Sequence, residues 1–190
     1  MRYTWGATGT VDAPNFGRLL HKTSPSGGAR HPGEVYVAAL DVDGLAPGLY
    51  HYDAKDHTLA QLRAGSASRM RKQVLRLTVG QTHAARAGAV CFMTAVFPRS
   101  MYKYRSARAY RVVTLETGHL GQTFCLLATW LGLAPFTTAA LADSAIEQAL
   151  GIDGASESVL YVAGVGMPKS IRARRARHAP RANAASRRRT

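Results

Sequence analysis

Residues 89–97 read AVCFMTAVF, an apolar run with β-branched and aromatic members and no charged residue. A run of this length and composition is typical of a strand that is covered on both faces. Such a strand needs neighbours in its own sheet and helices over the sheet. We therefore take this segment as the predicted centre of an α+β fold, and look on either side of it for the remaining strands and helices.

Strand patterns lie both before and after this run. Residues 34–42, EVYVAALDV, are rich in β-branched and aromatic side chains, and residues 158–165, SVLYVAGV, predict a last buried strand. Residues 48–61, GLYHYDAKDHTLAQ, predict a hairpin, because the polar residues Asp53–Asp56 suit a type I turn. The sheet is thus predicted to draw strands from most of the chain.

Three stretches have the apolar spacing expected of helices. One is the amphipathic segment 67–79, and another is a short helix predicted to run from the N-cap Asp143 to Leu150. The longest covers residues 107–131 and is followed by Gly132 as its predicted C-terminal stop. Its buried face is predicted to carry Leu120, Phe124, Leu127 and Leu131.

Length and composition fit one globular domain, since the chain has 190 residues of which 46% are apolar and 19% charged. The net charge of +14 would suggest a nucleic-acid partner, but nine Lys or Arg and no acidic residue fall within residues 169–190, which leaves about +5 on the rest. We predict a folded domain over 1–168 and a basic, disordered tail over 169–190. Without a recognisable nucleic-acid-binding motif, we do not expect nucleic acid as a partner.

Signals for secretion, membrane insertion and metal binding are missing from the pattern. The N-terminus MRYTWGATG has no apolar core of a signal peptide, and the longest apolar stretch, 125–136, is too short to span a bilayer. Cys91 and Cys125 form no CxxC motif and no Cys/His cluster, so we predict two buried thiols and no metal site. We expect a cytoplasmic protein without membrane contact.

Three polar segments are candidates for a functional site. The loop 24–32, SPSGGARHP, allows close approach of the backbone to a flat ligand, although a tight turn has the same composition. Residues 102–111, YKYRSARAYR, suit either proton transfer in an active site or a solvated basic helix start. In residues 116–122, ETGHLGQ, His119 is either a general base or a structural histidine facing the core. Glu116 and Gln122 are candidates to cap or bridge polar groups.

Taken in order, these segments resemble the SagB-type dehydrogenases, which are nitroreductase-like FMN enzymes. The resemblance extends over nearly the whole chain to Gly166 and rests on five elements in the family's order. These elements are the PSGGARHP loop at Pro25–Pro32, GL.PGLYHY at Gly44–Tyr52, the pair Lys103 and Tyr104 followed by RAYR at Arg108–Arg111, E.GH..Q at Glu116–Gln122, and LG.DG..E..LY at Leu150–Tyr161.

The resemblance implies a nitroreductase-like sheet flanked by helices, in a homodimer that holds FMN at its interface. The loop residues that would lie against the flavin ring are Pro25, Ser26, Gly27 and Gly28. Lys103 is implied to be the base that removes a proton from an azoline carbon, acting from a desolvated site, with Tyr104 positioning or relaying the proton. The hydride would pass to the flavin, giving a thiazole or oxazole in a ribosomal peptide, and oxygen would reoxidise the flavin. The implied partners are the peptide substrate and other peptide-modifying enzymes.

Two features depart from the family pattern. The Arg-rich element that opens family members and holds the FMN phosphate has no counterpart, because Arg2 is the only basic residue before Arg18. Either the family's N-terminal segment is lacking or the phosphate is held elsewhere, and Lys169, Arg172 and Arg174 are the candidates to pair with it. Beside the flavin, relatives often carry Gly where this chain has Thr137 followed by Thr138, Ala139 and Ala140. The last three are expected to contribute backbone N–H groups.

Three other functions remain open at this level. A nitroreductase-like fold also suits a general nitro or quinone reductase that uses NADPH, because a fold does not determine a substrate. Loss of the phosphate-binding element would suit a flavin-free scaffold in a peptide-modifying complex. The basic tail would bind polyanions with a steep salt dependence.

Overall fold

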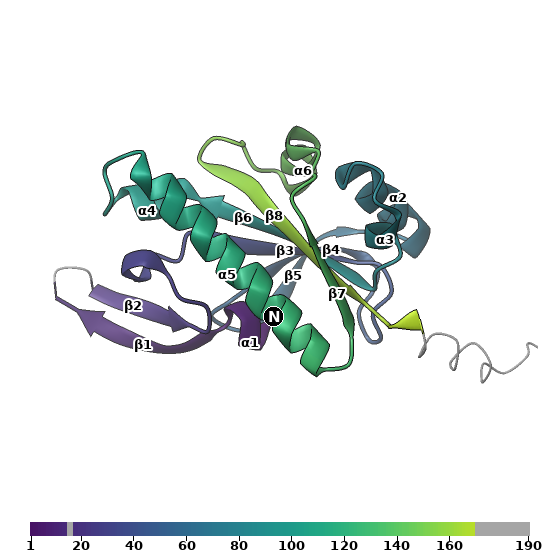
Figure 1. The fold of residues 1–190 in the computed structure, drawn as a ribbon, viewed down its shortest axis with the longest axis horizontal. Coiled ribbons are helices and arrows are strands. Elements are labelled where there is room, and N and C mark those ends of the chain that lie inside the picture. The colour runs from purple at the N-terminus through teal and green to yellow at the C-terminus, as the bar shows by residue number, and fades with distance from the viewer. Residues whose placement is uncertain (15–16, 170–190) are drawn as a thin grey trace, which may run out of the picture.

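The computed structural model describes residues 1–14 and 17–169 (Figure 1). Its main feature is a six-stranded antiparallel sheet in the order β5-β4-β3-β6-β8-β7. The strands are β3 (Gly33–Ala39), β4 (Gly48–Asp53), β5 (Thr58–Ala64), β6 (Ala89–Val96), β7 (Ala134–Thr138) and β8 (Glu157–Gly166). The predicted central strand 89–97 is confirmed, because β6 lies between β3 and β8 and is buried over most of its length.

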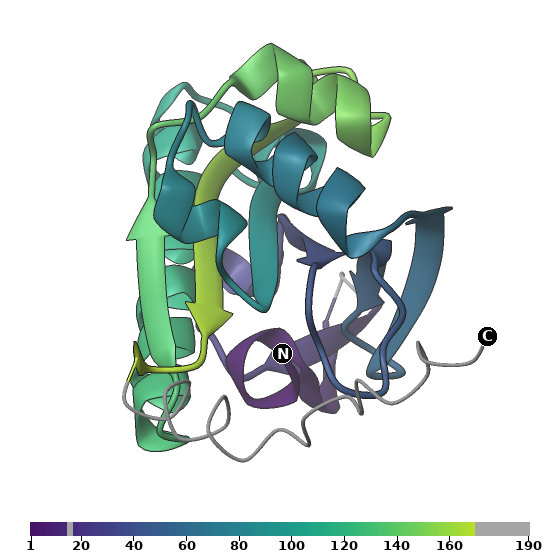
Figure 2. The ribbon, with the colours of Figure 1, turned by 90° about the vertical axis from the view of Figure 1, so that its right-hand side faces the viewer.

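Helices cover both faces of this sheet, as Figures 1 and 2 show. On one face, α2 (Ala67–Leu77), α3 (Thr82–Ala85) and α6 (Asp143–Leu150) pack over one buried cluster, to which β6 contributes Val90 and Phe92. On the other face, α1 (Arg2–Trp5) and α5 (Arg108–Trp130) pack over a second cluster that contains Cys91 and Met93. Alternate residues of β6 therefore supply both cores, and the predicted α+β class with a helix-flanked sheet is confirmed.

A separate two-stranded sheet precedes the loop 24–32. It is formed by β1 (Ala7–Ala13) and β2 (Gly17–Lys22), and in Figure 1 it extends from the lower left of the molecule. Most of its residues are exposed, so no apolar alternation marks these strands in the sequence. The hairpin matters for the site because β2 runs directly into the loop, which contains the short 3₁₀-helix η1 (Gly27–Ala29).

Several predicted boundaries need correction. Asp143 is the first residue of α6 and Ala142 takes the N-cap position without a side-chain hydrogen bond. Helix α5 ends at Trp130, one residue before the predicted end. Leu131 was predicted to lie on the buried face of this helix, but it is 62% exposed, and the last buried residue of the helix is Ala128. Phe97, predicted as strand, begins α4 (Phe97–Met101), where Pro98 suits the first helical turn. The hairpin, the helix 67–79 and the last strand are confirmed within a few residues.

The predicted absences can be checked over residues 1–14 and 17–169. No helix in these ranges is long and apolar enough to cross a membrane. The same residues contain no group of three or more His, Cys, Asp or Glu side chains placed to hold a metal ion. Both cysteines are free thiols, and Cys91 is buried as predicted, whereas Cys125 is only half-buried. The basic tail from residue 170 onward lies outside the described residues.

Candidate functional site

The loop 24–32 and the pair Lys103 and Tyr104 form one compact site. A β-carbon built on Gly28 would lie 2.7 Å from Lys103 Nζ, 2.8 Å from Lys103 Cδ and 3.0 Å from Tyr104 Oη. A β-carbon on Gly27 would lie 2.5 Å from Val112 Cγ1 of α5. The two glycines thus permit side chains from α5 and from the segment before it to pack directly on the loop backbone. The structure brings together the two motifs that the resemblance places beside a flavin.

The pair reaches the loop because of the chain reversal after β6. Helix α4 follows β6 immediately, and the backbone N–H groups of Lys103 and Tyr104 donate to the carbonyl oxygen of Ser100, at 3.1 and 2.9 Å. Ser100 is fully buried, so the turn is anchored to the body of the domain. Helix α5 begins five residues after Lys103, at Arg108, and runs back beneath the loop. The pair is therefore held at the start of the longest helix.

Glu116 connects α5 to the loop. Its Oε1 accepts a hydrogen bond of 2.6 Å from the Gly27 N–H, and the side chain is only 5% exposed. Burial raises the pKa of the Glu116 carboxyl, although the hydrogen bonds from the Gly27 N–H and the Ser26 side chain act in the opposite direction. The bridging role considered for Glu116 is confirmed. Among the described residues no group donates a hydrogen bond to its buried Oε2.

The loop backbone is strained just where it meets these side chains. Gly28, Ala29 and His31 have φ values of 61°, 54° and 45°, in the left-handed region that disfavours residues with a β-carbon. The Ser26 hydroxyl accepts a hydrogen bond of 2.8 Å from the His31 N–H and so closes the loop. Clustered positive φ values outside glycine are frequent at ligand-binding sites, which adds a backbone argument for this location.

His31 fixes the loop to β2. Its Nε2 lies 2.8 Å from the Leu20 carbonyl oxygen, and its ring meets that of Trp5 edge-on at 5.8 Å. Burial, reinforced by the charge of Lys22, lowers the pKa of His31 to about 4, so the ring is neutral near pH 7 and donates from Nε2.

The other two loop residues predicted to contact the flavin, Pro25 and Ser26, are less buried than Glu116, and so is Lys103. Pro25 is exposed and Ser26 is half-buried. Lys103 is also exposed, so the desolvated surroundings expected for a catalytic base are not provided by the described part of this chain alone. They would have to be completed by a ligand or by another chain.

The predicted flavin contacts after β7 do not join this cluster. The Thr138 hydroxyl accepts from Gln81 Nε2 at 2.9 Å and from the Ala140 N–H at 3.1 Å. The Gln81 amide also donates to the Ala140 carbonyl oxygen at 3.0 Å, while Ala139 is exposed. Within the described residues, no hydrogen bond links this segment to the loop 24–32.

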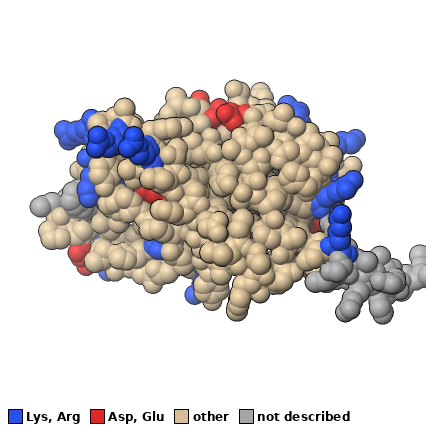
Figure 3. Space-filling model, in the orientation of Figure 1, with Lys and Arg blue, Asp and Glu red and all other residues tan. Residues whose placement is uncertain are grey.

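Two further predictions concern polar residues outside the loop. His119 is exposed on α5, so the interpretation of it as a core histidine is wrong. Lys169, which follows β8, is exposed, whereas Arg172 and Arg174 lie outside the described residues. Figure 3 shows Lys and Arg gathered over the connection between α4 and α5, where Lys103, Arg105, Arg108 and Arg111 are all exposed.

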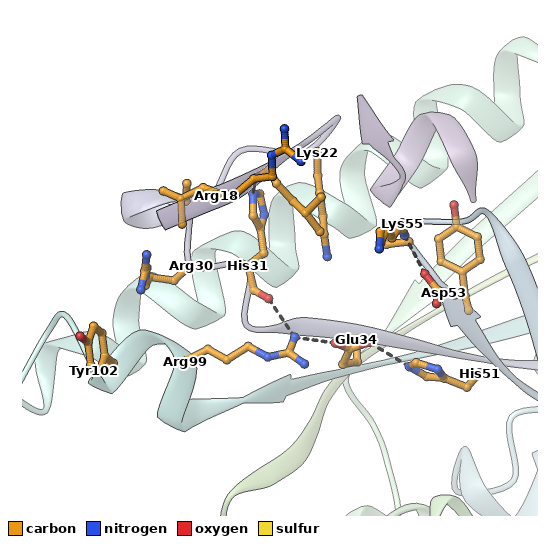
Figure 4. Close-up of a pocket in the computed structure, with 15 residues that line it drawn as sticks. Arg18, Lys22, Arg30, His31, Glu34, His51, Asp53, Lys55, Arg99 and Tyr102 are labelled. Atoms are coloured by element: carbon orange, nitrogen blue, oxygen red, sulfur yellow. Dashed lines mark hydrogen bonds and ion pairs between the residues drawn. The ribbon is translucent and has the colours of Figure 1, made fainter. Parts of the chain in front are cut away.

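A second polar region, which the sequence patterns do not predict, lies on the other side of the loop (Figure 4). Here Glu34 at the start of β3 pairs with Arg99 of α4 at 2.5 Å and with His51 of β4 at 2.8 Å. These residues line a cavity of about 670 Å³ together with Lys22 and Arg30. The only sequence signal was a glutamate at the edge of an apolar strand, and its partners lie far away in the chain.

Comparisons with known proteins agree with this architecture. The family described as the nitroreductase family matches residues 7–167. The trifolitoxin-processing protein TfxB of Rhizobium leguminosarum bv. trifolii is 34% identical over 161 residues, which cover 84% of this chain and 43% of TfxB. The chain thus spans less than half the length of that relative.

Two solved structures resemble the fold. A nitroreductase homologue from Anabaena variabilis superposes with a TM-score of 0.78 at 27% identity, covering 86% of this chain and 33% of the other. The Escherichia coli microcin synthetase McbBCD complex, solved with truncated pro-MccB17 bound, contains a chain with a TM-score of 0.71 at 21% identity. That match covers 88% of this chain and 61% of the other, and at this identity it supports the fold alone.

Proposed function

Because the chain belongs to the nitroreductase family, we propose that it is an FMN-dependent dehydrogenase that oxidises thiazoline or oxazoline rings of a ribosomal peptide to azoles. One observation carries the proposal: Lys103 and Tyr104, the pair that azole-forming enzymes of this type place beside the flavin, pack directly on Gly28 of the glycine loop. The similarity to a trifolitoxin-processing protein supports a role in peptide maturation.

The loop is suited to a flat aromatic ligand. Gly27 and Gly28 add no side chains of their own, while Val112, Lys103 and Tyr104 fill the space that their β-carbons would occupy. The buried Glu116 holds this backbone in place by accepting a hydrogen bond from the Gly27 N–H. Flavin phosphate would need a cation, and the exposed Lys169 after β8 is one described candidate. The residues present therefore fit the ring of FMN and offer one partner for its phosphate. When bound, FMN supplies the hydride acceptor, and dioxygen reoxidises it.

In this proposal the side chains of the protein accept and transfer the proton that leaves the azoline ring. Oxidation of an azoline to an azole removes two hydrogens, one as a hydride from carbon and one as a proton from the neighbouring ring position. Lys103 Nζ accepts the proton, and the Tyr104 hydroxyl, beside it over Gly28, orients the ring or passes the proton to solvent. Glu116 has a positioning role, because it contacts the loop backbone and not Lys103.

A homodimer would complete the site. The solvent face of α5 exposes Leu115, Leu126 and Trp130 to 58%, 62% and 81%, which is unusual for side chains of this kind on a monomeric surface. In this proposal a second copy of the chain buries the stripe and contributes its segment Thr138–Ala140 to the flavin site formed by the loop of the first chain. It would also remove water from Lys103, as a general base of this type requires.

The proposal is tested by comparing Lys103→Ala with Lys72→Ala, a matched change of an exposed lysine on α2. Both variants are assayed with FMN, dioxygen and an azoline-containing peptide, and the loss of two hydrogens is followed by mass spectrometry. We expect Lys103→Ala to slow oxidation by about 10²- to 10⁴-fold, and Lys72→Ala to have no effect. A wild-type protein that binds FMN and reduces nitro compounds with NADPH but leaves azolines unchanged would overturn the proposal in favour of a general reductase. A protein that binds no flavin would favour the scaffold.

A further inference from the structure

The cavity beside the loop is lined mainly by cations. Its walls carry five Lys or Arg side chains against two carboxylates, Glu34 and Asp53. The five are Arg18, Lys22, Arg30, Lys55 and Arg99. They come from β2, the loop, the turn between β4 and β5, and α4, so elements far apart in the sequence converge on one concave surface (Figure 4). A cavity of about 670 Å³ is within the usual range of ligand sites.

The two carboxylates do not neutralise this surface. Glu34 is shared between Arg99 and His51, and its hydrogen bond raises the pKa of His51. Asp53 Oδ1 accepts the backbone N–H groups of Lys55 and Asp56 at 2.8 and 3.1 Å, and so caps its own turn. Both acids therefore hold the walls of the cavity together. Arg18 pairs with Asp12 at 3.8 Å, so the cationic excess is carried chiefly by Lys22 and Lys55.

Lys22 is a partly buried cation in the wall of the cavity. Its Nζ lies 4.4 Å from the centre of the Trp5 ring, and Figure 4 shows the side chain reaching toward the space above Glu34. Burial lowers the pKa of Lys22 to about 8, although the charge of Glu34 acts against this. A carboxylate placed in the cavity would favour the charged form of this lysine.

The cavity adjoins the proposed catalytic pair. Ala29, Arg30 and His31 line it, while Gly28, one residue earlier in the same loop, is covered by Lys103. At this end the wall is formed by Tyr102, the residue directly before Lys103, with its ring 5.8 Å from the Arg30 guanidinium. Because Tyr102 and Lys103 are neighbours in the chain, a ligand that extends from the cavity past Tyr102 would approach Lys103.

Building on the proposed function, we propose that this cavity binds an acidic side chain of the peptide substrate, a few residues from the ring to be oxidised. A peptide fits better than a phosphate compound, because the cavity also offers acceptors. Glu34 and Asp53 can accept peptide N–H groups, and a fully ionised phosphate has none to donate. The cavity would thus select substrates with Asp or Glu beside the ring-forming residue.

The test uses two azoline peptides that differ only in carrying Glu or Gln near the ring. For the wild type we expect KM to be about tenfold lower for the Glu peptide, with kcat unchanged, since hydrogen bonds to charged groups have this magnitude. Lys55→Gln, at an exposed turn, and Lys22→Gln are expected to remove most of this preference. Lys72→Gln, on the far helix α2, should retain it. Equal KM values for the two peptides in the wild type would overturn the inference.

A binding assay separates this inference from the proposed function. A fluorescent peptide with the same Glu but no azoline ring is titrated with wild type, Lys55→Gln, Lys22→Gln and Lys72→Gln. Weaker binding to Lys55→Gln and Lys22→Gln, but not to Lys72→Gln, supports the acidic subsite even if no azoline is ever oxidised. Binding that is unaffected by Lys55→Gln and Lys22→Gln, or binding of pyrophosphate in place of the peptide, would overturn the subsite while oxidation of azolines continued to support the dehydrogenase.

Discussion

Replacement of Gly28 by alanine separates backbone strain from disruption of the site. Gly28 and Gly44 both have positive φ, 61° and 77°, but a β-carbon on Gly44 meets no atom within 4 Å. An alanine in this region costs roughly 1–2 kcal/mol at either position, which for a domain of this size lowers Tm by roughly 2–8 °C. The two variants should therefore lose similar free energy of unfolding, measured by thermal or urea denaturation.

Only Gly28→Ala should damage activity. The new methyl group would lie 2.7 Å from Lys103 Nζ, so Lys103 must retreat by about 1 Å to reach an ordinary contact distance. A misplacement of about 1 Å in a catalytic group costs on the order of 10²-fold in rate. Initial rates of azoline oxidation are compared between the two variants at matched FMN saturation. The reasoning is refuted if Gly28→Ala keeps the rate of Gly44→Ala, or if both lose it equally.

Substitutions at three further residues test other parts of the structure. Since the pKa of His31 lies at about 4 rather than 6.5, the folded protein should lose stability as the pH falls below about 6.5, by roughly 3 kcal/mol at pH 4. His31→Gln keeps a donor for Leu20 and should flatten that dependence in urea titrations at several pH values, so an unchanged slope would contradict a neutral buried ring. Glu116→Ala removes the acceptor of the Gly27 N–H and should cost roughly 1–3 kcal/mol. Glu116→Gln should cost less than Glu116→Ala. Because burial raises the pKa of Glu116, the wild type should lose stability as the pH rises, and the deficit of Glu116→Gln relative to the wild type should shrink. Urea curves measured from pH 5 to 8 would disprove this if the deficit grew. Leu126→Asp on the exposed stripe should give a monomer with weakened FMN binding in analytical ultracentrifugation and flavin titration, and a dimer that persists would place the interface elsewhere.

The apolar periodicity predicted the elements that are buried on a regular pattern. Strand β6 was recognisable because it contributes to both cores, and α5 because Leu120 and Phe124 repeat along one face. The hairpin β1–β2 was missed because its side chains are mostly exposed and obey no alternation. Strand β7 was missed because it is short and contains Pro135, which is tolerated there only because the strand lies at the edge of the sheet.

The site was predictable in part. The loop and the pair at 103–104 carry local motifs, so their residues could be named, but their contact through Gly28 depends on the path of α4 and α5. The bond from Gly27 to Glu116 joins residues 89 positions apart, and the cavity residues are drawn from β2, β3, β4, α4 and the segments that connect them. Such long-range convergence leaves no trace in periodicity or spacing. A histidine at a helical position is equally ambiguous, and His119 turned out to face solvent.

The most direct measurement of the central claim is an anaerobic titration of the FMN-loaded protein with an azoline peptide, followed by absorbance near ~450 nm, where oxidised flavin absorbs. The account predicts that the band is bleached in proportion to the peptide added, that the peptide loses two hydrogens, and that Lys103→Ala bleaches much more slowly than Lys72→Ala. A band that is unaffected by the peptide but is bleached by NADPH would contradict the account and assign the chain to the general reductases.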